Sequence, residues 1–246
     1  RMSKVGIEGE RLDCIAYRPP TIFRSIQIPQ ASIGGRMRLL GADEAGKGPV
    51  IGSMFVAGVV IDEDRLFDLA ALGVKDSKLL SPARREVLAG RIEKIALDKY
   101  VLEVRPEVID ELRKIMTMND VMVRSFSKVL ENLSADRAIL DAADVNAERF
   151  ARRVKEVSGT EMEVVAEHRA DRNHPVVAAA SILAKVKRDR SVREIEVAVG
   201  REIGSGYPSD PATVRFLESW VTEHGDLPPV ARQSWKTAER IKARFI

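Results

Sequence analysis

The segment from Leu39 to Gly52 constrains the fold and the chemistry of this 246-residue chain more than any other. An apolar run leads into two adjacent carboxylates, Asp43 and Glu44, and then breaks into a glycine-rich turn that carries a lysine. Carboxylates hold hard metal ions, and glycine amides allow a phosphodiester to come close. The segment therefore predicts metal-assisted chemistry on a nucleic-acid backbone.

Composition limits the class of protein. Charged residues make up 31% of the chain and almost cancel to a net charge of +3, so binding to a polyanion has to come from local patches. The single cysteine, Cys14, excludes an internal disulfide and favours a reducing compartment. Neither a bilayer-spanning apolar run nor the layout of a secretory signal is present, so we expect a soluble, cytoplasmic protein without membrane contact.

Residues 1–36 lack the hydrophobic periodicity found in the rest of the chain. Prolines at 19, 20 and 29 and the Gly34-Gly35 pair interrupt any periodicity, and Met37 stands directly before the first convincing strand. We interpret 1–36 as an upstream extension; the alternative is a regulatory or oligomerisation arm.

Hydrophobic periodicity predicts a mixed α/β sheet. The expected strands are 38–42, 50–61, 100–104, 137–140 and 162–166, and the expected helices are 82–97, 106–115, 120–132, 147–157 and 175–199. The first two strands follow one another through a turn, as an antiparallel pair does. The later strand–helix–strand alternation implies parallel pairing.

The texture changes again after Gly200. Turn residues fill 203–211, and two short helical stretches are expected at 212–223 and 230–244. This part predicts a helical appendage rather than an independent domain. The expected division is an extension over 1–36, a catalytic domain over 37–200 and a C-terminal appendage over 201–246.

Four acidic residues stand at or just beyond strand ends, where sites gather in α/β sheets: Asp43, Glu44, Asp141 and Asp171. Each one taken singly could be a solvated loop carboxylate. Successive strand residues point to opposite faces, so the adjacent pair shares a site only if the first strand stops there. Gly46 and Gly48 supply that stop. Asp136 and Asp144 compete with Asp141, but the former precedes the apolar run and the latter begins the next turn.

The expected cofactor is a hard divalent ion, Mg²⁺ or Mn²⁺. Three histidines and one cysteine leave few soft ligands, whereas clustered carboxylates without a cation repel one another. Two such ions about 4 Å apart can activate water and stabilise the leaving oxygen of an in-line phosphoryl displacement.

Cations and hydroxyls form a second layer of candidates. Ser77 and Lys78 lie in a turn where they could hold a phosphate or form a plain solvated loop. Ser181 and Lys185 lie four residues apart on one helix face and make a second candidate phosphate contact. The small residues around Ser181 indicate close packing of helix on sheet. The basic run 187–190 is open between substrate contact and solvent-facing charge.

Tyr207 lies outside any apolar pattern, in a turn with Gly206 and Pro208. It could cap the core. It could also stack on a sugar or base, where contacts at the 2′-hydroxyl tell ribose from deoxyribose.

Taken together, these residues resemble type 2 ribonuclease H, in its archaeal-like branch, over about residues 37 to 240. The matching segments are Gly41–Pro49, Asp76–Lys78, the strand end at Asp141, Ala170-Asp171 ahead of Pro175–Lys185, and Gly204–Tyr207. The resemblance implies a ribonuclease H-like fold with a five-stranded sheet and a hybrid duplex lying between the domain and the appendage. It also implies that Asp43, Glu44, Asp141 and Asp171 bind the metal ions.

The same resemblance assigns the substrate contacts. Gly46-Lys47-Gly48 matches a glycine–basic–glycine segment that contacts the ribonucleotide through its backbone, and Tyr207 matches a tyrosine that packs against the sugar at the junction with DNA. The middle residue of that segment is often Arg in the family, and Lys offers a point charge in place of a planar fork. The type 3 relatives fit less well, because 1–36 is too short for their additional domain.

The expected activity is cleavage of RNA in RNA–DNA hybrids and 5′ of ribonucleotides embedded in duplex DNA, leaving 3′-hydroxyl and 5′-phosphate ends. The rivals are a Holliday-junction resolvase or transposase-like nuclease and, from another class, a non-catalytic nucleic-acid-binding module. We expect a monomer. The ending Ile241–Ile246 is too weak a signal to assign a sliding-clamp contact.

Overall fold

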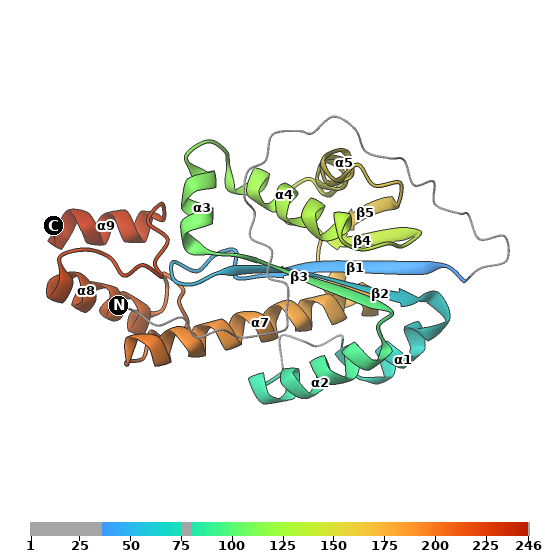
Figure 1. Ribbon diagram of the computed structural model, residues 1–246, viewed down its shortest axis with the longest axis horizontal. Helices are drawn as coiled ribbons and strands as arrows, with labels where there is room; N and C mark the ends of the chain where they lie inside the picture. Colours follow the sequence, from blue (N-terminus) through green and yellow to red (C-terminus); the bar gives the residue numbers. More distant parts are fainter. Residues whose placement is uncertain (1–35, 75–79, 246) are drawn as a thin grey trace, which may run out of the picture.

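A five-stranded mixed sheet forms the centre of the protein in the computed structural model, which describes residues 36–74 and 80–245 (Figure 1). The strands are β1 Arg38–Ala45, β2 Met54–Asp62, β3 Asp98–Val104, β4 Arg137–Asp141 and β5 Glu163–Glu167, in the spatial order β3-β2-β1-β4-β5. β1 pairs antiparallel with β2 and parallel with β4. The predicted mixed sheet is confirmed.

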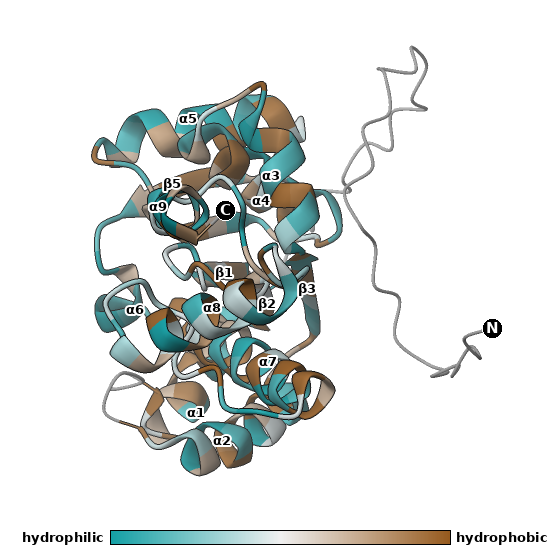
Figure 2. Cartoon of the chain, turned by 90° about the vertical axis from the view of Figure 1, so that its left-hand side faces the viewer, coloured by the Kyte–Doolittle hydropathy of each residue, from teal (hydrophilic) through white to brown (hydrophobic). Residues whose placement is uncertain are grey.

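Helices cover both faces of the sheet. They are η1 Glu63–Arg65, α1 Leu66–Ala71, α2 Pro82–Ile95, α3 Pro106–Arg113, α4 Met118–Glu131, α5 Ala147–Ser158, α6 Ala170–Asn173, α7 Pro175–Val199, α8 Pro211–His224 and α9 Lys236–Phe245. α4 and α5 lie over one face, α7 runs along the other, and α1 and α2 pack outside α7 (Figures 1 and 2). α8 and α9 sit together at the end of the sheet. None of the described helices is long and apolar enough to cross a membrane.

The two largest errors in the predicted boundaries lie where the chain meets its C-terminal part. The strand expected from residue 50 begins at Met54, because the amides of Val50 and Ile51 donate to the Gly206 carbonyl at 2.8 and 3.2 Å. The helix expected from residue 230 begins at Lys236, because the preceding residues run alongside this loop and form the Ile51–Ala231 bridge. The short helices α1 and α6 were not predicted.

The C-terminal helices share a hydrophobic core with the rest of the molecule. Val50 and Ile51 pack with Phe216 and Leu217 of α8, and α7 contributes Ile195 to the same cluster. α8 is therefore joined to the sheet through the loop that follows β1.

The backbone of α7 lies directly against β1 at Gly41. A β-carbon at this position would lie 2.4 Å from the carbonyl carbon of Val176, a backbone atom that cannot turn aside. The next turns of α7 present the fully buried Ala178, Ala179 and Ala180. The predicted close packing of small residues is confirmed, and it places the helix directly on the strand that carries Asp43.

Replacing Gly41 with alanine should separate α7 from β1 and lower the free energy of unfolding by about 3 kcal/mol or more, at the upper end of what overpacking costs. The matched control is Gly90→Ala in α2, where an added β-carbon meets nothing within 4 Å. That change should stabilise the protein by about 1 kcal/mol through helix propensity. Urea unfolding of both variants checks this, and equal stability of the two would contradict the packing argument.

Candidate active site

Asp43 and Asp141 lie side by side on neighbouring parallel strands. The β1–β4 register pairs Ala42 with Leu140, so each aspartate follows one residue beyond the last paired positions. Neighbouring strands are about 4.8 Å apart, and paired positions in a parallel sheet face the same side. Asp43 is only 5% exposed and lies on the α7 side of the sheet.

Burial and its neighbours set the electrostatics of Asp43. Desolvation, followed by repulsion from Asp141 and Glu44, raises the pKa of Asp43 to about 8. A hydrogen bond from the Ser181 hydroxyl acts in the opposite direction. Lys185 donates from Nζ to Ser181 Oγ at 2.8 Å, which confirms that these two residues of α7 share one face. A helix that packs closely on β1 therefore delivers a hydroxyl to a buried carboxylate.

Glu44 lies on the other side of β1 from Asp43 and interacts electrostatically with Asp141. β1 continues through Ala45, three residues beyond the expected end at 42, and stops directly before Gly46. Burial raises the pKa of Glu44, and Asp141 raises it further, whereas the amide of Lys47 donates to Glu44 Oε2 at 3.2 Å and lowers it. Glu44 thus interacts electrostatically with the aspartate pair but is tied to the glycine-rich turn.

A backbone hydrogen bond brings Asp171 to the same region. The amide of Ala170 donates to Asp141 Oδ1 at 2.8 Å, and Asp171 follows in α6 with 3% exposure. The chain turns into α6 at Arg169, which has φ 59° and is the one non-glycine residue with positive φ among those described. This conformation costs a residue with a side chain about 1–2 kcal/mol, and here it aims the helix start at Asp141.

The two competing aspartates have other structural roles. Asp136 accepts the amide of Arg38 at the start of β1, 2.7 Å away and at the opposite end of the sheet. Asp144 accepts the Asn146 amide and the Arg149 guanidinium, and these bonds lower its pKa. Their placement favours Asp141 as the residue that belongs with Asp43.

The donor set fits a hard divalent cation. Within residues 36–74 and 80–245, no three histidine, cysteine or carboxylate side chains are placed closely enough to form a ready metal-binding group. The donors at the strand ends are nevertheless all carboxylate oxygens, which Mg²⁺ and Mn²⁺ prefer. Burial and the negative charge of Asp141 raise the pKa values of Asp43 and Glu44, and a bound cation would offset this repulsion.

A cavity of about 210 Å³ is lined by one of these acids, Glu44. Its lining also includes Gly46, Lys47, Lys185, Arg188 and Tyr207. Lys47 donates from Nζ to the Ala143 carbonyl at 2.7 Å, so its side chain ties the turn to the segment after β4. A larger cavity of about 410 Å³ lies between α2, β3 and α7, and its lining includes Glu86, Lys99 and Arg190 but no predicted site residue.

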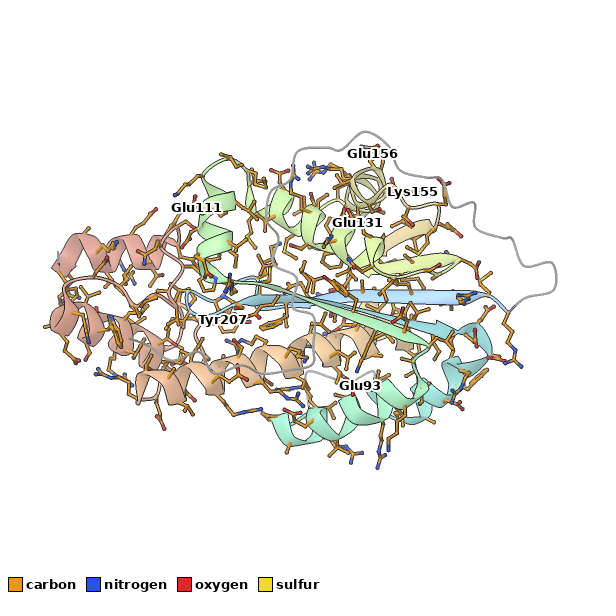
Figure 3. The ribbon with its side chains drawn as sticks, in the orientation of Figure 1. Glu93, Glu111, Glu131, Lys155, Glu156 and Tyr207 are labelled. Carbon is orange, nitrogen blue, oxygen red and sulfur yellow. The ribbon has the colours of Figure 1, made fainter. Side chains whose placement is uncertain are left out.

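Tyr207 lies between the end of the sheet and α7 (Figure 3). Its ring is 3.4 Å from where a β-carbon on Gly48 would be, and the Arg188 guanidinium carbon lies 5.4 Å from the ring centroid. Arg188 also donates to the Ser205 carbonyl, and its side chain is only 15% exposed. The sequence left the basic run 187–190 open between substrate contact and solvent-facing charge. For Arg188, the interpretation as solvent-facing charge was wrong. The predicted residues Ser77 and Lys78 lie outside the described part of the chain.

One buried cation escaped the sequence analysis. Arg232 is fully buried and donates to the carbonyls of Gly46, Lys47 and Gly52. The sequence analysis placed Arg232 in a helix expected over 230–244, where an arginine gives no signal of burial, whereas the helix begins at Lys236.

The comparisons identify the family. The family model described as "Ribonuclease HII" matches residues 40–238. The chain belongs to the ribonuclease HII family. "Ribonuclease HII" of Methanothrix thermoacetophila is 66% identical over 210 residues, which cover 85% of this chain and 100% of that protein. The ribonuclease H2 of Pyrococcus horikoshii OT3 is 43% identical, covers 85% of this chain and 99% of its own, and superposes with a TM-score of 0.81.

A further relative was solved with a partner. The structure of the PCNA:RNase HII complex from Archaeoglobus fulgidus is 44% identical, with 83% of this chain and 96% of that chain covered and a TM-score of 0.76. Membership of the ribonuclease HII family makes this chain an enzyme, a nuclease that acts on RNA in RNA–DNA hybrids. The resemblance and the ribonuclease H-like fold are confirmed, and the interpretation as a binding module without activity was wrong.

We predict that Asp43→Asn stabilises this ribonuclease HII in buffer without divalent ions. Because burial raises the pKa of Asp43 to about 8, folding takes up a proton between about pH 4 and pH 8. Stability conferred by the protonated carboxyl is therefore lost as pH rises through 8. At pH 9 the variant should melt at least about 2–4 °C above the unmodified chain, equivalent to about 1 kcal/mol at this size.

Thermal melts with chelator and with Mg²⁺ check this prediction. Mg²⁺ should raise the melting temperature of the unmodified chain by more than that of the variant. An Asp136→Asn control should behave like the unmodified chain towards Mg²⁺. Equal Mg²⁺ stabilisation of Asp43→Asn and the unmodified chain would remove Asp43 from the metal-binding group.

Proposed function

We propose that this chain is an endoribonuclease that cuts RNA in hybrids and also 5′ of ribonucleotides embedded in duplex DNA, with two divalent ions held by Asp43, Glu44, Asp141 and Asp171. The observation that carries this proposal is the pair of aspartates at neighbouring strand ends, one of them next in the chain to Glu44, which lines a cavity together with the glycine-rich turn. When bound, the metal ions would activate water and neutralise the charge that develops on the phosphoryl oxygens.

The chain's own residues hold the carboxylates in place. Ser181 donates its hydroxyl to Asp43, and the ammonium of Lys185 fixes that hydroxyl. The Ala170 amide holds one oxygen of Asp141. These bonds keep the carboxylates oriented although repulsion between them favours their separation. Lys185 also lines the cavity, where its charge would contact a substrate phosphate.

Selection of a ribonucleotide is assigned to the turn Gly46-Lys47-Gly48 and to Tyr207. Backbone amides of a glycine turn can approach a sugar closely, and the 2′-hydroxyl is both donor and acceptor. The Tyr207 ring packs over Gly48 and is held by Arg188, so a sugar entering the cavity would meet a rigid aromatic face. We assign Ser77 and Lys78 to a phosphate on the basis of sequence.

The proposed domain division follows from the same contacts. Residues 37–200 would supply the carboxylates, and residues 201–246 would supply Tyr207 and close the substrate groove. The shared cluster of Val50 and Ile51 with α8 supports a C-terminal unit that is fixed to the catalytic part.

A duplex containing one ribonucleotide tests the proposed function. The unmodified chain with Mg²⁺ or Mn²⁺ should nick it immediately 5′ of that residue, leaving a 3′-hydroxyl, and should leave an all-DNA duplex intact. Asp43→Asn should reduce the rate by at least about 10³-fold, the order expected for loss of a group that supports charge development. A cut elsewhere, or a four-way junction cut faster than the hybrid, would contradict the proposal.

Substitution of Tyr207 should affect junction substrates selectively. Tyr207→Phe keeps the ring and should cost less than about threefold, whereas Tyr207→Ala should cost about 10- to 100-fold on the single-ribonucleotide duplex, equivalent to about 1–3 kcal/mol of lost stacking. The loss on a continuous hybrid should be smaller. Trp220→Ala, an aromatic truncation in α8, is the control. An equal loss on both substrates would argue against a role at the junction.

A sliding clamp is a proposed partner. Support comes from the Archaeoglobus fulgidus relative, which was solved as a PCNA complex. In this chain Phe245 at the end of α9 is 40% exposed, with the Arg244 guanidinium over its ring, and offers an accessible apolar contact near the C-terminus.

A further inference from the structure

Arg232 is the largest of the fully buried side chains, and its charge faces backbone rather than carboxylates. Nη2 donates to the Gly46 carbonyl at 2.6 Å, Nη1 to the Lys47 carbonyl at 3.0 Å and Nε to the Gly52 carbonyl at 2.9 Å. All three guanidinium nitrogens are thus used on one loop. Burial lowers the pKa of Arg232 to about 10, so it remains a cation at neutral pH.

The segment Ala231–Trp235, which we call the C-terminal strap, is itself anchored at both ends. Asp110 of α3 accepts the amides of Gln233 and Ser234 at 2.7 and 3.0 Å and the Ser234 hydroxyl at 2.6 Å. Trp235 packs its ring 4.8 Å from the Arg232 guanidinium carbon and donates its indole N–H to the Gly48 carbonyl at 3.1 Å. The strap therefore clamps the carbonyls of Gly46, Lys47 and Gly48 from one side.

Holding a carbonyl also sets the direction of the next amide. In a trans peptide the C=O and the following N–H lie in one plane and point in opposite directions. The peptide whose oxygen Arg232 holds at Gly46 sends its N–H, on Lys47, to Glu44 Oε2. The peptide held at the Lys47 carbonyl likewise turns the Gly48 N–H away from Arg232. Arg232 thus fixes two successive peptide planes of the turn.

The cost of this arrangement points to a function. A buried cation loses several kcal/mol of hydration, and attraction to Asp110 and Glu44 offsets only part of that loss, since the pKa of Arg232 remains lowered. Gly46 has φ 91° and Gly48 is exposed, so the turn has few side-chain contacts of its own to fix its shape. A rigid planar fork is suited to holding several carbonyls at set angles, and a lysine is not.

We propose that Arg232 is a positioning residue for ribonucleotide selection: through the C-terminal strap it fixes the peptide planes of Gly46-Lys47-Gly48 that face the sugar. This inference rests on the proposed function of that turn. Arg232 does not touch the substrate, because its nitrogens are occupied by the loop. Its loss should therefore weaken discrimination between ribose and deoxyribose rather than abolish the metal-dependent reaction.

The test compares Arg232→Met, Arg232→Lys and Trp235→Phe with Arg240→Met, which removes an exposed arginine of α9. Hydrogen exchange should be faster at the amides of 46–48 in Arg232→Met, and less so in Trp235→Phe, which loses only the bond to the Gly48 carbonyl. On the single-ribonucleotide duplex, kcat/KM should fall about 10- to 100-fold in Arg232→Met, the usual cost of losing a residue that orients a binding group. Arg232→Lys should recover a minor part of the kcat/KM lost in Arg232→Met, and Arg240→Met should match the unmodified chain.

The substrate dependence separates positioning from general damage. A continuous hybrid offers many ribonucleotides. In Arg232→Met, kcat/KM measured on the hybrid should therefore fall by less than kcat/KM measured on the single-ribonucleotide duplex. Unchanged exchange at 46–48 in Arg232→Met would overturn the inference, as would faster exchange with an unchanged substrate preference. If Arg232→Met does not fold, Trp235→Phe decides by the same two measurements. Failure of the unmodified chain to cut the single-ribonucleotide duplex would instead overturn the proposed function. Hydrogen exchange at the amides of 46–48 would then still test whether Arg232 fixes the turn.

Discussion

The contact between Gly41 and the first turn of α7 is the constraint on which the site depends. Only a residue without a β-carbon allows the backbone of Val176 to lie against β1. That distance lets Ser181, further along the same helix, reach the carboxylate of Asp43 two residues beyond the glycine. The same helix continues to Lys185 and Arg188 at the cavity. Backbone packing in the core thus sets the position of polar groups at the strand ends.

Two kinds of buried charge meet at the glycine-rich turn. On one side, burial and the negative charge of Asp141 raise the pKa values of Asp43 and Glu44, which favours the arrival of a cation. On the other side, the buried Arg232 attracts Glu44 and is bonded to the turn. The peptide between Gly46 and Lys47 connects them, since its oxygen accepts from Arg232 and its N–H donates to Glu44. The turn is therefore a structural link between the carboxylates and the C-terminal strap.

Sequence reasoning succeeded where the signal is local. The long apolar periodicity of α7 gave its bounds, 175–199, and the strand-end position of Asp141 placed it beside Asp43. It failed where a distant segment decides the conformation. Val50 and Ile51 look like strand residues, yet their amides bond Gly206 some 150 positions later in the chain, and this pairing is invisible to periodicity. The burial of Arg232 was missed, and that of Arg188 was left open, for the same reason: charged residues are rarely buried unless particular partners surround them.

Glu44 shows how far a spacing argument reaches. Alternation along a strand predicted that Asp43 and Glu44 face opposite sides, and a strand stop was invoked to bring them together. β1 continues to Ala45, so the alternation holds and Glu44 remains on its own side, held by the Lys47 amide. Glu44 would therefore have to reach an ion bound at Asp43 and Asp141 from the other side of the strand end. The turn held by Arg232 sets the position of Glu44 through the Lys47 amide. The turn proposed to select the sugar and the carboxylate proposed to complete the metal site are therefore joined by one hydrogen bond, from the Lys47 amide to Glu44.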